Sequence, residues 1–100
     1  MEIAKRVYPI LRHLPDFEKF GLQSQLARSA ISIPSNIAEG CAKSSTKDFK
    51  RYLEFSLGSA YELETQLILT SDIHGLETEE LIEKLNHEQM MITSLIKKLK

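Results

Sequence analysis

Apolar residues recur along most of the chain at steps of three and four, the repeat of an α-helix that buries one face. No stretch alternates apolar and polar residues with the period of two that a half-buried strand requires. The breaks between the helical stretches are short, which favours antiparallel packing of neighbouring helices. The pattern predicts an all-α protein, an up-and-down antiparallel four-helix bundle in which residues 1–100 form a single domain.

Prolines interrupt the first helix. Its apolar stripe begins at Ile3 and ends at Leu14, with Pro9 inside it. Proline removes one helical hydrogen bond and crowds the preceding turn, so we expect either a kink or a helix that starts near Pro9. Pro15 ends the helix, and residues 15–21 are expected to form a connection with at most one short turn.

The second helix is expected from Leu22 to Gly40, where a glycine suits a left-handed C-terminal cap. Pro34 predicts that this helix is kinked near Ile33. A proline leaves carbonyl groups without a donor, and polar side chains nearby can supply one. The candidates are Ser32, Ser35 and Asn36.

The third helix is the longest one predicted. Ser45 and Asp48 have N-cap and N3 spacing at its start, and His74 and Gly75 mark its end. Gly58 lies in its middle, where glycine costs about 1 kcal/mol relative to alanine. We expect a close helix contact at Gly58, and the sequence leaves open whether the contact lies within the chain or with another subunit.

The last helix is expected to begin at Thr78, with acidic residues in its first turn, where the helix dipole favours them. Lysines occupy the opposite end, at Lys97, Lys98 and Lys100. Its apolar positions have coiled-coil spacing, with Glu88 as the one polar member. The positions are Leu81, Leu85, Glu88, Ile92, Leu95 and Leu99.

The composition argues against several classes of site. Cys41 is the only cysteine, which rules out an intramolecular disulfide and a zinc site of several thiolates. The three histidines, His13, His74 and His87, have neither metal-ligand spacing nor a recognisable catalytic partner. We therefore predict no catalytic residues, metal, cofactor or small-molecule substrate, and hence no enzyme.

The sequence also predicts a cytoplasmic protein without a membrane partner. No window approaches the roughly 18 consecutive apolar residues of a membrane-spanning helix. Met1 and Glu2 lead directly into a helical pattern that contains charges, unlike a signal peptide.

A basic cluster at the start of the third helix is the best candidate for nucleic-acid binding. Its members are Lys43, Lys47, Lys50 and Arg51. The formal net charge of −1 differs from the positive excess of dedicated nucleic-acid binders, so a solvated basic face is the alternative interpretation. Tyr52 is expected on another face, away from the cluster.

A polar stripe runs beside the apolar face of the second helix and is a candidate structural or interface site. Its members, with one residue of the third helix, are Arg28, Ser32, Ser35, Asn36, Glu39 and Glu62. The stripe is either solvated or used for pairing. In the second case we expect Arg28 to pair with a carboxylate of the third helix, namely Glu54, Glu62 or Glu64.

Three runs of residues resemble a known family. They are GLxxQLARSA at 21–30, SIPSNIAEG at 32–40 and LGSAYELETQL at 57–67, and the likeness extends over nearly the whole chain. These runs are similar to those of the bacterial four-helix-bundle proteins called 23S rRNA intervening-sequence proteins. The resemblance implies an up-and-down bundle that assembles into a ring-like homopentamer, in a family without a settled biochemical role.

The resemblance carries two further implications. Some members are encoded within sequences that interrupt large-subunit ribosomal RNA genes, and a related accessory protein of diversity-generating retroelements resembles a nucleic-acid-binding pentamer. That relative is basic, whereas this chain is not. The first helix also begins later here than in typical relatives, so we expect its N-terminal turns and their contacts to be missing.

Two functional hypotheses follow. The leading one is a non-enzymatic oligomeric scaffold or interaction protein, because the last two helices carry more apolar residues than one small bundle needs to bury. These surplus residues are Leu57, Ile68, Leu69, Ile82, Met91 and Ile96. The alternative is an RNA- or DNA-binding module in which a homo-oligomer repeats the basic patch, so that weak contacts add up.

Overall fold

The computed structural model describes residues 2–99, and within that range every regular element is a helix. This confirms the predicted all-α class. The elements are α1 (Glu2–Leu11), the short 3₁₀ turn η1 (Asp16–Glu18), α2 (Leu22–Cys41), α3 (Thr46–His74) and α4 (Glu79–Lys98). Lys100, expected at the end of the last helix, lies outside the described residues.

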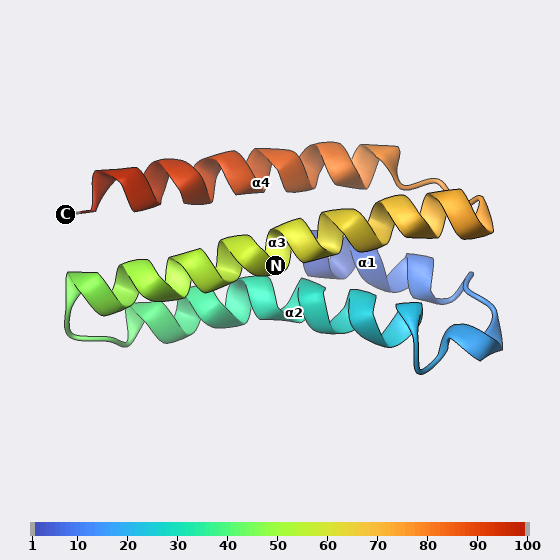
Figure 1. Ribbon diagram of the computed structural model, residues 1–100, viewed down its shortest axis with the longest axis horizontal. Coiled ribbons are helices and arrows are strands. Elements are labelled where there is room, and N and C mark those ends of the chain that lie inside the picture. Colours follow the sequence, from blue (N-terminus) through green and yellow to red (C-terminus); the bar gives the residue numbers. More distant parts are fainter. Residues whose placement is uncertain (1, 100) are drawn as a thin grey trace.

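The four helices form an up-and-down bundle about 44 Å long (Figure 1). Neighbours in the chain pack against each other and α1 closes the bundle against α4, whereas in the two diagonal pairs no Cα atoms lie within 8 Å of each other among residues 2–99. With ten residues, α1 is half as long as α2 and α4. It therefore accompanies its neighbours over one half of the bundle only (Figure 1).

The core is built on one face of α3. Leu53, Ala60, Leu63 and Leu67 have no exposed surface, and they pack with buried aliphatic residues of the other three helices. Burial of this face is the main source of stability, because each fully buried leucine contributes roughly 1.5–3 kcal/mol relative to exposure.

Leu63→Ala is expected to lower the free energy of unfolding by about 2–5 kcal/mol, because it leaves a cavity in a packed core. Glu54→Ala on the exposed side of the same helix is the control, with an expected loss below about 1 kcal/mol. Urea unfolding followed by circular dichroism measures both values. Equal losses would contradict the assigned orientation of α3.

The ends of α3 are as predicted. The Ser45 hydroxyl accepts a hydrogen bond from the Asp48 amide at 3.1 Å, which is the expected N-cap. Gly75 has φ of 67° and forms a left-handed C-cap, a conformation that glycine adopts without steric cost.

Gly40 plays a different role from the one predicted. It lies inside the last turn of α2, which continues to Cys41, and it does not adopt the left-handed conformation. A Cβ atom at Gly40 would lie 2.9 Å from the Tyr52 Cβ and 3.0 Å from the Phe49 Cδ1. The predicted cap is therefore wrong, and glycine is required here because α2 and α3 approach closely.

Gly58 is exposed, and an added Cβ atom would meet nothing within 4 Å. The expectation of a close contact within the chain is therefore wrong. Contact with another subunit, the alternative that the sequence left open, stays a prediction.

Both helical prolines lie within continuous helices. The α1 helix runs through Pro9 and ends at Leu11, so neither a start near Pro9 nor an end at Leu14 is correct. The carbonyl that loses its donor at Pro34 is that of Ala30, four residues earlier. Within residues 2–99 none of the three candidates, Ser32, Ser35 and Asn36, donates to it, and the Asn36 Nδ2 donates to the Ser32 carbonyl at 2.9 Å. The Ser56 hydroxyl of α3 donates to the Ile33 carbonyl at 2.8 Å.

The polar member of the α4 core is Gln89 and not Glu88, which is half exposed. The Gln89 Nε2 donates to the Ala60 carbonyl at 3.3 Å and to the Glu64 Oε1 at 2.9 Å, so its amide is satisfied where it is buried. The coiled-coil spacing assigned Glu88 to the buried face. That spacing repeats every seven residues, and over seven residues an ideal α-helix rotates its buried face by about 20° relative to the repeat.

Candidate functional site

The basic cluster lies at the end of the bundle where α2 turns into α3 (Figure 1). Lys43, Lys47 and Arg51 are exposed and Lys50 is half buried, and none forms an ion pair within the described part of the chain. Lys97 and Lys98 at the end of α4 are exposed at the same end of the molecule (Figure 1). The cluster is therefore available to an anionic partner.

Aromatic rings accompany these cations, contrary to the expectation for Tyr52. The Lys43 Nζ lies 5.1 Å from the centre of the Tyr52 ring, and the Arg51 guanidinium lies 5.6 Å from that of Phe55. The two rings meet edge to face at 5.4 Å. The spacing along α3 predicted Tyr52 on a different face from the cluster. Lys43 lies in the connection before α3, and from there its side chain reaches the Tyr52 ring.

The polar stripe on α2 lies at the surface beside α3. Arg28, Ser35 and Glu39 are exposed, whereas Ser32 and Asn36 are half buried. Arg28 makes no ion pair within residues 2–99, so the expected pair with Glu54, Glu62 or Glu64 is not found. Glu64 accepts its hydrogen bond from Gln89 of α4, and it therefore faces away from α2.

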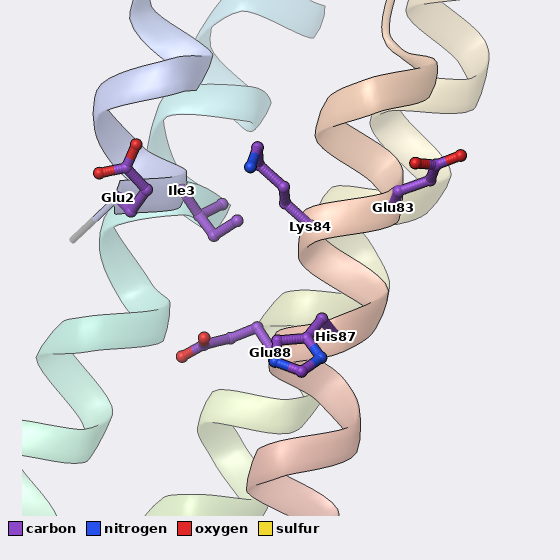
Figure 2. A pocket seen from close by; sticks show the side chains of 6 residues that line it. All are labelled: Glu2, Ile3, Glu83, Lys84, His87 and Glu88. Atoms are coloured by element: carbon purple, nitrogen blue, oxygen red, sulfur yellow. The ribbon is translucent and has the colours of Figure 1, made fainter.

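An open pocket lies where α1 begins beside α4 (Figure 2). Its lining combines Glu2 and Ile3 of α1 with Glu83, Lys84, His87 and Glu88 of α4. Lys84 points across the opening toward α1, whereas Glu83 points away from it (Figure 2). Among residues 2–99 no group of three histidine, cysteine or acidic side chains is placed to hold a metal ion.

Glu18 and His74 form an ion pair that the sequence did not predict. The His74 Nε2 lies 2.7 Å from the Glu18 Oε2, and both side chains are largely buried. The Glu18 Oε1 accepts a hydrogen bond from the Leu22 amide at 3.1 Å, which caps α2 because Gly21 has no capping side chain. One carboxylate thus joins the start of α2 to the end of α3.

The hydrogen bond from His74 lowers the pKa of the Glu18 carboxyl below its ordinary value, and the Leu22 amide lowers it further. Desolvation of the carboxyl opposes this shift, and the charge of His74 adds a smaller lowering of the pKa. The only sequence signals for this pair were an acidic residue three positions before a glycine N-cap and a histidine in the last turn of a helix.

Glu18→Gln is expected to lower the melting temperature at neutral pH. A lowered pKa in the folded state gives stability that is present above the ordinary carboxyl pKa and is lost as pH falls through the lowered value. The gap between wild type and variant should therefore narrow as pH falls below the ordinary carboxyl pKa of about 4.3. Thermal unfolding between pH 3 and 7 measures it, with the exposed Glu62→Gln as control. A gap that stays constant over this range would contradict the pair's role.

Residues 1–97 match the family described as 23S rRNA-intervening sequence protein. The chain belongs to this family. The match covers almost the whole sequence, as the resemblance of the three motifs implied. No curated protein matches the chain.

A solved structure supports the membership of this 23S rRNA-intervening sequence protein. It is the crystal structure, at 1.70 Å resolution, of a protein with unknown function from the S23 ribosomal protein family of Bacteroides thetaiotaomicron VPI-5482. The two chains are 30% identical, with a TM-score of 0.74, over 95% of this chain and 88% of the other. The shared fold is thus shown, while the role of the relative is unknown.

Within the described residues, no helix is both long enough and apolar enough to cross a membrane.

Proposed function

We propose that this 23S rRNA-intervening sequence protein is a non-enzymatic, cytoplasmic scaffold that works as a homo-oligomer. The observation that carries the proposal is the outward face of α3. Tyr61, Leu69 and Ile73 are exposed on the side of α3 that also carries Gly58, among exposed polar residues such as Glu62. A glycine without a contact in its own chain costs helix stability, and close approach of a second copy would compensate for that cost.

A second apolar surface supports the same proposal. Met90, Met91 and Leu95 are exposed on the C-terminal half of α4. Of the surplus apolar residues named from the sequence, Leu57, Ile82 and Ile96 pack on the core of the chain, whereas Ile68, Leu69 and Met91 are exposed.

The two apolar surfaces lie on different helices, so a contact between them is heterologous. Such contacts repeat from copy to copy and close into a ring when the rotation per copy permits it. The homopentamer implied by the family resemblance is an arrangement of this kind. We therefore propose that the face around Gly58 packs against the exposed flank of α4 in the next copy, with the Arg28 stripe near its edge.

Gly58→Ala tests the contact between copies independently of the stability of the single chain. An added methyl has free space within the chain, so the variant helix should gain up to about 1 kcal/mol. The same methyl should weaken assembly if a second copy approaches Gly58 closely. Sedimentation velocity at micromolar concentration is expected to show a smaller assembly, and chemical unfolding a chain that is no less stable.

Ser24→Ala on the exposed side of α2 is the matched control, since it changes a helix surface outside the two apolar faces. If Gly58→Ala forms an assembly of the same size as wild type and the control, then Gly58 does not lie in the interface. A wild-type chain that sediments as a monomer would reject the oligomeric scaffold itself.

Nucleic-acid binding is the second candidate function. It is favoured by the four exposed or half-exposed cations at the start of α3 and by the rings of Tyr52 and Phe55 beside them. Cations bind phosphates, and neighbouring aromatic rings add stacking surface for bases. In an oligomer this cluster would be repeated, so modest contacts would add up.

Lys47→Glu with Lys50→Glu is expected to weaken binding of a structured ribosomal RNA fragment by at least about tenfold at low salt, since two phosphate contacts become repulsive. Lys5→Glu with Lys19→Glu changes the net charge equally but lies outside the cluster, and it should have a smaller effect. Filter binding across a salt series measures both. Equal effects of the two double variants would reject a site at the cluster.

A further inference from the structure

Charged residues are distributed unevenly between the two ends of the bundle. The end with the α2–α3 connection carries the cations Lys43, Lys47, Lys50, Arg51, Lys97 and Lys98. The opposite end, with η1 and the α3–α4 connection, carries the carboxylates Asp16, Glu18, Asp72, Glu77, Glu79 and Glu80. Fewer opposite charges lie at each end, namely Glu39 and Asp48 at the basic end and Lys5, Arg6, Arg12 and Lys19 at the acidic end, where an Arg6 nitrogen lies 3.8 Å from Glu80 Oε1. The two ends therefore carry an excess of opposite charge.

Two phenylalanines project from the acidic end. Phe17 is 80% exposed and Phe20 is 89% exposed, more than any other large apolar side chain among residues 2–99. Both belong to the connection between α1 and α2, which surrounds the largely buried carboxylate of Glu18. Because Glu18 is bonded to both His74 and Leu22, this connection is already ordered, which lowers the entropic cost of using the two rings in a contact.

The basic end offers chemistry that suits these rings. The cations Lys43 and Arg51 already lie over the faces of Tyr52 and Phe55 in their own chain. Lys19 similarly lies 5.6 Å from the centre of the Phe20 ring. Lysine and arginine thus lie over aromatic rings at both ends, and a further ring placed beside the basic cluster would gain the same attraction.

We propose that the acidic end of one copy docks on the basic end of a second copy, with Phe17 and Phe20 set among the cations of the basic cluster. The contact joins two different surfaces and does not close on itself, so it extends along the bundle axis. It is distinct from the side-by-side contact around Gly58, which lies on the flank of the bundle.

The size of the end face determines how strong this contact can be. The bundle measures 23 by 17 Å across, and the end therefore offers roughly 400 Å², about half of what each partner contributes to a standard stable interface. One such contact is weak. It becomes substantial when side-by-side copies present several ends together, and in this respect the inference rests on the proposed oligomer.

Light scattering of the nuclease-treated protein at two salt concentrations tests the proposal. At about 20 mM salt the weight-average mass is expected to be roughly twofold or more above that at about 500 mM, since screening at high salt removes attraction between exposed charges. Phe17→Ser with Phe20→Ser should abolish the rise while leaving the mass at high salt unchanged. A wild-type mass independent of salt would overturn the proposal.

Charge-reversed variants test the pairing of the two ends directly. Lys47→Glu with Lys50→Glu makes the basic end acidic, and Asp16→Lys with Asp72→Lys makes the acidic end basic; all four residues lack a side-chain ion pair within residues 2–99. Neither variant should associate end to end alone, but an equal mixture should, because each supplies the end that the other has lost.

The outcomes separate this proposal from the proposed oligomer. A mixture that stays at the mass of its components, or single variants that behave as wild type, would overturn end-to-end docking. A monomeric mass at high salt in every sample would reject the side-by-side oligomer. If the mass nevertheless rises at low salt, the end-to-end contact is supported without the side-by-side oligomer. Circular dichroism of each variant verifies that the helices are retained.

Discussion

The close packing of α3 on α2 is the contact on which the rest of the molecule depends. Gly40 permits it, because Tyr52 and Phe49 occupy the space that a side chain at this position would need. The hydroxyl of Ser56 donates to the Ile33 carbonyl within the same contact, close to the proline of α2. The contact also orients α3, so that its leucines enter the core and Gly58 faces outward.

The contact leaves several surfaces of the bundle uncovered within residues 2–99. Apolar residues are exposed on α3 and on the C-terminal half of α4, and the two connections at one end bring carboxylates and phenylalanines together. Because these surfaces lack a partner within the described part of the chain, association of copies is the function that we propose.

Most of the fold could be predicted from the spacing of apolar residues, because helix packing depends on which side chains share a face. The caps at Ser45 and Gly75 were also correct, since both depend on local chemistry. The errors at Gly40 and Gly58 share a cause. Each depends on how closely another helix approaches the glycine, which spacing within a single helix does not determine.

The candidate surfaces were less predictable for the same reason. The basic cluster could be located because its members are close in sequence, but its aromatic neighbours required the position of Lys43 in space. The pair of Glu18 and His74 joins residues 56 positions apart, and its residue types alone gave no indication of it. In the Arg28 stripe Ser32 and Asn36 are half buried, and the expected pair of Arg28 with a carboxylate of α3 is not found within residues 2–99.

The central claim is that the exposed apolar flanks of this 23S rRNA-intervening sequence protein are contacts between copies of the chain. Sedimentation equilibrium of the wild-type protein at micromolar concentration and high salt tests it most directly, because salt suppresses charge-driven contacts but not apolar ones. The claim predicts a single species with the mass of several chains. A mass equal to that of one chain would contradict it.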